Sequence, residues 1–209
     1  MWTLATASGL ALTGWIVIAV PILLFVSGPL AGALTGILQR SVLKQHGLSS
    51  KKWLAMNIIA WTIGMSVFGC PTVYSPGFEI LGDALRLVSL LVCDGLLIGA
   101  IIGLGQRSEL QALSAYGNRW IFSNAAALAI SFGAGSLLFS AISEVIDHSS
   151  IAHGEWAPFT TAIFAFGVSL AVIPPIIGII YGLITGFVLG RFVQQHELES
   201  DQTVQVKMH

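Results

Sequence analysis

The chain has 209 residues, of which 55% are hydrophobic and 9% are charged. A soluble domain carries about 25% charged residues, so the composition excludes a soluble globular enzyme and a disordered chain. Nine Lys and Arg residues are balanced by ten Asp and Glu residues, which leaves no basic surface for nucleic acid. With a mean hydropathy of +0.85, the sequence predicts an integral membrane protein embedded in a lipid bilayer.

Five stretches are apolar enough to be membrane helices, which need about 20 residues each. They cover residues 10–38, 53–69, 85–106, 120–142 and 160–189. The first and last contain prolines, which kink membrane helices when neighbouring helices satisfy the freed carbonyl groups. We therefore expect an all-α polytopic membrane helix bundle of five transmembrane helices. It forms a single transmembrane domain over residues 1–191, and residues 192–209 are a polar, frayed cytoplasmic tail.

The basic residues gather on one side of these five spans. Cytoplasmic loops of membrane proteins are enriched in Lys and Arg. The N-terminus is therefore expected outside and the C-terminus in the cytoplasm. The cytoplasmic side holds eight of the nine cations: Arg40, Lys44, Lys51, Lys52, Arg107, Arg119, Arg191 and Lys207.

The chain also repeats itself. When Gly28 is aligned with Gly95, glycines, polar residues and a tryptophan coincide along both copies. The alignment matches Gly28, Gly32, Gly36, Gln39, Arg40, Ser41, Trp53 and Asn57 with Gly95, Gly99, Gly103, Gln106, Arg107, Ser108, Trp120 and Asn124. A third glycine series lies in the last span, at Gly178, Gly182 and Gly186. Each full unit has two spans, so the sequence predicts two and a half parallel copies of a helical hairpin.

Glycines four residues apart share one face of a helix and form a stripe. Lipid gives no hydrophobic drive between helices, so a stripe that lets two backbones approach closely favours packing. We expect the first, third and fifth spans to meet along their stripes, with the second and fourth outside. The alternative is that membrane helices are simply rich in glycine. The missing sixth helix indicates that another chain fills the last groove.

Two polar pairs flank the glycine stripes. Gln39 and Gln106 each follow the last glycine of a stripe by three residues, and Asn57 and Asn124 lie one turn inside the next helix. Each Gln is predicted to hydrogen-bond the Asn of its own hairpin, at about 0.6 kcal/mol per bond. In the last span Leu189 occupies the position of the Gln.

Asp94 is the only acid near the middle of a span. An Asp at the centre of a membrane helix costs about 2.5–3.5 kcal/mol on insertion scales. One interpretation is a proton- or cation-binding group in a translocation path. The other is a protonated acid that hydrogen-bonds a backbone or hydroxyl group. Transport relays contain several ionisable residues at depth, whereas this chain has one.

Other chemical signals are weak. The outer-loop residues Asp147, His148, His153 and Glu155 have no metal-ligand spacing and fit a solvated loop. No catalytic or phosphate-binding motif occurs, so neither an enzyme, a metal site nor a cofactor is expected. The tryptophans lie mostly near predicted span boundaries and fit an aromatic belt: Trp2, Trp15, Trp53, Trp61, Trp120 and Trp156.

The pattern Gly-x3-Gly-x2-Gln, a basic residue, a short loop and a Trp-headed helix resembles a group of small multi-pass bacterial membrane proteins that is frequent in cyanobacteria. The segment Tyr181-Gly182-Leu183-Ile184-Thr185-Gly186 is similar to their last span. The chain departs from that group at Arg40 and Arg107, where a Trp often follows the Gln. The resemblance implies a bacterial inner (plasma) membrane, or a thylakoid membrane in a cyanobacterium, and it carries over no catalytic residue.

Two functions are consistent with these features. The first is a scaffold, assembly factor or accessory subunit that associates with another membrane protein or with itself. The alternative is a small proton-, ion- or solute-transport protein that uses Asp94.

Overall fold

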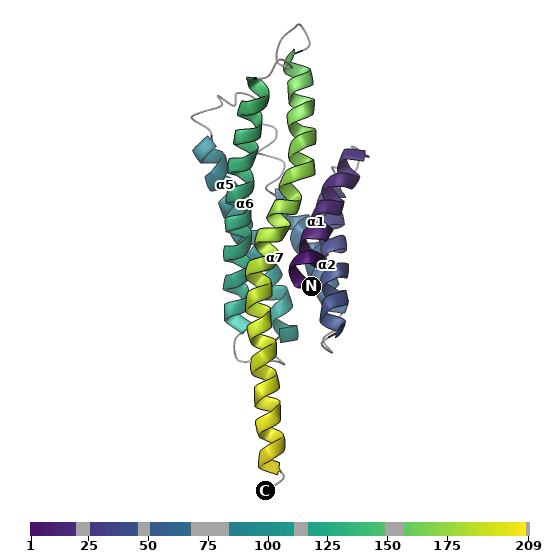
Figure 1. Ribbon diagram of the computed structural model, residues 1–209, viewed down its shortest axis with the longest axis vertical. Helices are drawn as coiled ribbons and strands as arrows, with labels where there is room; N and C mark the ends of the chain where they lie inside the picture. The colour runs from purple at the N-terminus through teal and green to yellow at the C-terminus, as the bar shows by residue number, and fades with distance from the viewer. Residues whose placement is uncertain (20–25, 46–50, 68–83, 111–116, 149–156, 208–209) are drawn as a thin grey trace.

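The computed structural model describes residues 1–19, 26–45, 51–67, 84–110, 117–148 and 157–207 (Figure 1). Over these residues the fold is all-helical, as predicted, and contains no strand. The six helices are α1 (Trp2–Ala19), α2 (Ser27–Gln45), α3 (Lys51–Val67), α5 (Ala84–Leu110), α6 (Gly117–Asp147) and α7 (Ala157–Lys207).

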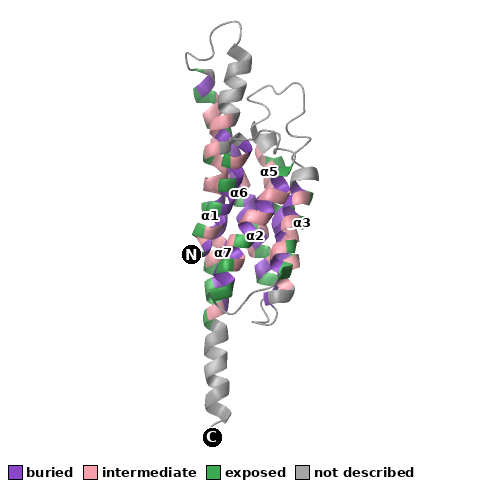
Figure 2. Ribbon diagram, turned by 90° about the vertical axis from the view of Figure 1, so that its right-hand side faces the viewer, coloured by how far each residue is buried: buried purple, intermediate pink, exposed green. Residues whose placement is uncertain are grey.

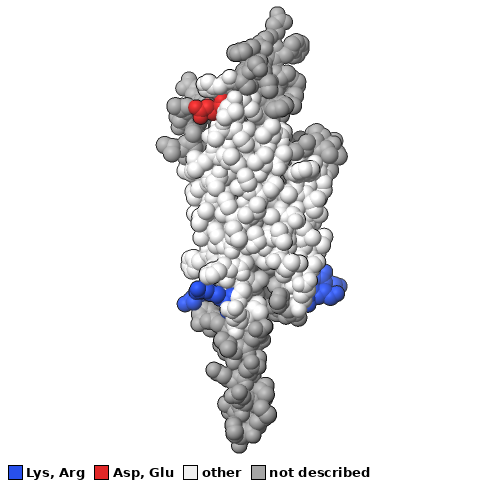
Figure 3. Space-filling model, in the orientation of Figure 1, with Lys and Arg blue, Asp and Glu red and all other residues white. Residues whose placement is uncertain are grey.

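Three of these helices are long and apolar enough to cross a membrane. The apolar segments are Val88–Arg107 in α5, Gly117–Ile146 in α6 and Gly167–Gln194 in α7, and α1 contributes the shorter Trp2–Val17. On the face shown in Figure 3, Lys and Arg side chains lie near one end of the described surface and an acidic side chain lies near the other. The band between them carries neither, which is the charge distribution that a bilayer requires.

The predicted first span, 10–38, is two helices. α1 ends at Ala19 and α2 begins at Ser27. They pack antiparallel, since Gly9 lies against Thr35 while Thr6 is bonded to Gln39 further along. A Cβ atom on Gly9 would lie 2.7 Å from Thr35 Cα. The five-helix prediction is therefore wrong for the described residues.

Contacts between neighbouring helices join the six described helices into a closed ring in the order α1, α2, α3, α5, α6, α7, with α7 packed against α1. Figures 1 and 2 show α1 beside α7. Two neighbouring pairs, α2 with α3 and α5 with α6, are the hairpins predicted from the repeat. The third pair joins α7 to α1, from opposite ends of the sequence. The groove that was assigned to another chain is thus filled by α1.

Both ends of the described chain also differ from expectation. Trp2 contacts Trp53 and Trp120, which lie in the first turns of α3 and α6, next to the basic residues. The start of α1 therefore lies at the cationic end of the bundle and not at the opposite end, as five spans required. α7 continues as a helix to Lys207, whereas the sequence predicts a frayed tail from residue 192 (Figure 1).

Candidate functional site

Three buried tryptophans meet at the cationic end of the bundle. Trp2, Trp53 and Trp120 come from α1, α3 and α6, and none is more than 7% exposed. Their ring centroids are 5.8, 6.3 and 6.0 Å apart, within the range of favourable aromatic pairs. These three residues therefore belong to the core of the bundle and not to an aromatic belt. Trp61 is also buried, Trp15 is 64% exposed, and Trp156 lies outside the described residues.

Each indole N–H group of this cluster donates a hydrogen bond to the partner helix of its pair. Trp53 Nε1 donates to Gln39 Oε1 at 3.2 Å, and Trp120 Nε1 donates to Gln106 Oε1 at 3.0 Å. Trp2 Nε1 donates to Thr185 Oγ1 at 2.9 Å. One such bond ties each pair of helices together near the cationic end.

These bonds replace the predicted bonds between Gln and Asn. The Asn57 amide donates to the carbonyl oxygen of Trp53, four residues earlier in its own helix, at 3.0 Å. The Asn124 amide does the same with Trp120 at 2.8 Å. The tryptophan, and not the Asn, links each Gln to the second helix of its hairpin, and the bond satisfies an indole N–H group that would otherwise be buried without an acceptor.

The α7–α1 pair is a third copy of the repeat. Its Trp-bearing helix, α1, corresponds to α3 and α6 of the other copies, but it lies at the start of the sequence and not after α7. Trp2 and Thr6 are four residues apart, as are the Trp and Asn of α3 and of α6. Thr6 Oγ1 donates to the Trp2 carbonyl at 3.1 Å, as the Asn side chains do. This Trp-x3-polar spacing was present in the sequence and could have identified α1 as the missing helix.

The register of this third copy is one turn earlier than the alignment of the glycines predicts. Thr185 takes the place of the Gln as indole acceptor, and it follows Gly182 by three residues, as each Gln follows its glycine. Gly178 and Gly182 are thus the equivalents of Gly99 and Gly103. Leu189 is not the equivalent of the Gln.

The glycine stripes lie inside the pairs. Gly32 and Gly36 face α3, and a Cβ atom on Gly32 would lie 2.5 Å from Asn57 O. In α5, a Cβ atom on Gly103 would lie 2.6 Å from Ile121 Cα. The remaining stripe contacts pair Gly95 and Gly99 with α6, and Gly178, Gly182 and Gly186 with α1, while Gly28 is buried in α2. The stripes thus meet the Trp-bearing helices and not one another.

A second set of hydrogen bonds joins neighbouring pairs. Gln39 Nε2 donates to Thr6 Oγ1 at 3.0 Å, from α2 to α1. Tyr181 donates a short hydrogen bond to Asn124 Oδ1, from α7 to α6. At the third junction, between α5 and α3, Gln106 Nε2 has no hydrogen-bond partner among the described residues. The polar network thus runs from α3 through α2, α1, α7 and α6 to α5, and it is open at that junction.

Asp94 lies outside this cluster, on α5 next to Gly95. Its side chain is 5% exposed and makes no hydrogen bond to a described residue. Arg86 is the cation nearest to Asp94 in the sequence, and its side chain lies outside those that the structure describes.

The structure also describes part of the outer loop. His148 Nδ1 lies 2.8 Å from the carbonyl oxygen of Glu144. The described residues contain no group of three His, Cys, Asp or Glu side chains that could hold a metal ion. His153 and Glu155 lie outside the described residues.

No protein-family model matches the chain, and neither the curated proteins nor the solved structures contain a match to it.

Proposed function

We propose that this is an integral membrane protein that acts by association, as a scaffold, assembly factor or accessory subunit of a larger membrane complex. The observation that carries the proposal is the filled core. Trp2, Trp53 and Trp120 pack together at the cationic end, and each glycine face is covered by a helix of the same chain. The outer surface is therefore the part of the molecule that can bind a partner.

That outer surface is apolar and carries large side chains. A bilayer covers such a surface with lipid, and another membrane helix can replace the lipid by closer packing. The partner, or a second copy of this chain, would bind there and not in a groove inside the ring. The most exposed large residues include Trp15, Phe122, Leu137, Val145, Leu183 and Phe187.

The proposed location is a bacterial inner membrane, or a thylakoid membrane in a cyanobacterium. The start of α1, the basic ends of α2 and α5, and Arg191 of α7 lie at one end of the bundle. The positive-inside rule places that end in the cytoplasm. Both termini are then cytoplasmic, in contrast to the topology expected from five spans.

The test is the native mass of the tagged protein after extraction from its own membrane in a mild detergent. Co-purifying chains are identified by mass spectrometry, and an unrelated tagged membrane protein of similar expression serves as the control. We expect a stoichiometric second protein that is absent from the control. A lone monomer or a homo-oligomer would contradict an accessory-subunit role.

A second candidate function is transport of a proton, ion or small solute. It is favoured by one observation, the burial of the Asp94 carboxyl group in α5 without a hydrogen bond to a described residue. Flux into liposomes that contain the purified protein tests it. A carrier should lose flux in Asp94→Asn and keep it in Ser27→Ala. Ser27 is the matched control, because it precedes Gly28 as Asp94 precedes Gly95 in the repeat. Absence of flux in the native protein, or flux that Asp94→Asn leaves unchanged, rejects this candidate.

A further inference from the structure

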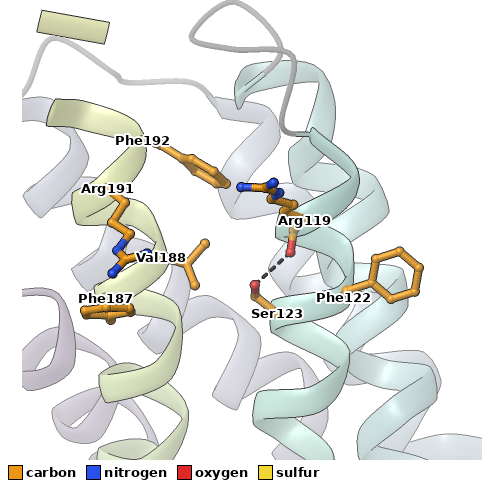
Figure 4. A pocket seen from close by; sticks show the side chains of 7 residues that line it. All are labelled: Arg119, Phe122, Ser123, Phe187, Val188, Arg191 and Phe192. Atoms are coloured by element: carbon orange, nitrogen blue, oxygen red, sulfur yellow. Dashed lines mark hydrogen bonds between the residues drawn. The ribbon is translucent and has the colours of Figure 1, made fainter. Parts of the chain in front are cut away.

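A pocket of about 360 Å³ lies between α6 and α7 at the cationic end of the bundle (Figure 4). Its α6 side is lined by Arg119, Phe122 and Ser123. Its α7 side is lined mainly by Phe187, Arg191 and Phe192. The pocket therefore combines two guanidinium groups with aromatic rings.

The two arginines lie where the apolar parts of their helices end. Arg119 is in the first turn of α6, which begins at Gly117. Arg191 lies near the end of the apolar segment of α7, Gly167–Gln194. Both guanidinium groups are thus at the level of the lipid headgroups in a bilayer that covers the apolar band.

The guanidinium groups are held by aromatic neighbours. The Arg191 guanidinium carbon lies 4.5 Å from the centroid of the Phe187 ring, in a cation–π contact. Figure 4 shows the Arg119 guanidinium group pointing toward the Phe192 ring. Ser123 Oγ donates to the Arg119 carbonyl at 2.7 Å. Arginine donates paired hydrogen bonds to phosphate, and the N-terminus of α6 adds a favourable dipole.

The rim of the pocket is apolar and faces outward. Phe122 is 74% exposed and Phe187 is 63% exposed. One turn further from the cationic end, Ala126 on α6 and Leu183 on α7 are also exposed. Apolar side chains therefore continue from the pocket toward the middle of the apolar band. This arrangement fits a ligand with an anionic head and long apolar chains.

We propose that this pocket binds an anionic phospholipid, with its phosphate between Arg119 and Arg191 and its acyl chains along Phe122 and Phe187. The inference goes beyond the proposed function, because it depends on a membrane location and not on any protein partner. Free phosphate offers the same head chemistry without the acyl chains, so it is the alternative that the experiment must separate.

The experiment titrates the delipidated full-length protein in detergent with phosphatidylglycerol and measures bound lipid by native mass spectrometry. The test variant is Arg119→Gln/Arg191→Gln. The matched control is Lys44→Gln/Lys51→Gln, which removes two exposed charges from the same end of the bundle but outside the pocket. We expect the Kd for phosphatidylglycerol to rise about tenfold in the test variant and to change less than twofold in the control.

Several outcomes would overturn the proposal. Equal weakening in both variants would indicate general charge attraction. Phosphatidylcholine that binds as tightly as phosphatidylglycerol would remove the role of the anionic head. Displacement of the lipid by equimolar sodium phosphate would assign the pocket to free phosphate. If the double variant does not fold, Arg191→Lys is measured instead. It keeps the charge but loses the paired donors, and unchanged lipid affinity in it would contradict the assignment.

Discussion

The indole N–H groups of Trp2, Trp53 and Trp120 explain several polar residues in an otherwise apolar bundle. A buried donor without an acceptor is costly, and each indole here finds its acceptor on the partner helix. Gln39, Gln106 and Thr185 are those acceptors. The amide and hydroxyl side chains at these positions are therefore part of the packing of the tryptophan cluster.

The two glutamines are expected to contribute unequally to stability. Gln39 bonds both Trp53 and Thr6, whereas Gln106 bonds Trp120 and its Nε2 group has no partner among the described residues. Gln39→Leu should therefore lower the free energy of unfolding by about 1 kcal/mol more than Gln106→Leu does. Thermal or denaturant unfolding in detergent measures the difference. Equal losses in the two variants would contradict the open junction between α5 and α3.

A double-mutant cycle tests the bond between Tyr181 and Asn124. Tyr181→Phe and Asn124→Ala should show a coupling free energy of about 0.6–1.7 kcal/mol, which runs from the average to the largest value measured for bonds between membrane helices. The control cycle pairs Tyr181→Phe with Asn57→Ala, since Asn57 bonds its own helix. A coupling as large in the control as in the test cycle would argue against a specific bond.

At the scale of the helix, spacing predicts the glycine face but not the helix that covers it. The stripes at Gly28–Gly36 and Gly95–Gly103 follow directly from residues four apart. The same pattern is compatible with packing inside a hairpin or between hairpins. The structure packs these two stripes, which lie on α2 and α5, against α3 and α6, and it packs the third stripe, on α7, against α1.

The register of the third copy shows a related limit of sequence reasoning. α7 has glycines at four evenly spaced positions, Gly178, Gly182, Gly186 and Gly190, so a shift of one turn keeps most of the matches. The Gln that fixes the register in the other copies is replaced by Thr185. The correct register follows only from the hydrogen bond that Trp2 donates to Thr185.

The prediction that residues 10–38 form one span was wrong for a different reason. Residues 10–38 are almost continuously apolar, and composition does not distinguish a proline kink from a turn between two helices. Pro29 lies in the first turn of α2, where a missing N–H group costs no helical hydrogen bond. It therefore marks the start of a helix and not a kink.

Two glycines of α7 provide a matched test of helix packing. A Cβ atom on Gly178 would lie 2.6 Å from the backbone of Ala7 in α1, whereas one on Gly190 would have no atom of a described residue within 4 Å. Gly178→Ala should lower the melting temperature of the purified protein, because α1 must move away. Gly190→Ala should leave the melting temperature unchanged or raise it, since alanine stabilises a helix by about 1 kcal/mol relative to glycine. A melting temperature lowered equally by both changes would contradict the assignment of α1 to this face.

At the scale of the whole molecule, three helical pairs surround one tryptophan cluster. The third pair is assembled from α7 and α1, so α1 completes the ring. The closed ring is what directs the proposed partner and the proposed lipid to the outer surface. It also places the start of α1 at the cationic end, next to the basic residues of the other helices.

The most direct test of this closed ring is the side of the membrane on which each terminus lies. Reporters that are active only in the cytoplasm or only outside it are fused separately to the N-terminus and the C-terminus of the full chain. The proposed topology has all six described helices in the membrane, with α1 beside α7, so both termini lie on the same side. The positive-inside rule predicts that this side is the cytoplasm. An N-terminus outside and a C-terminus inside would contradict the account, because α1 and α2 would then cross the membrane together as one span.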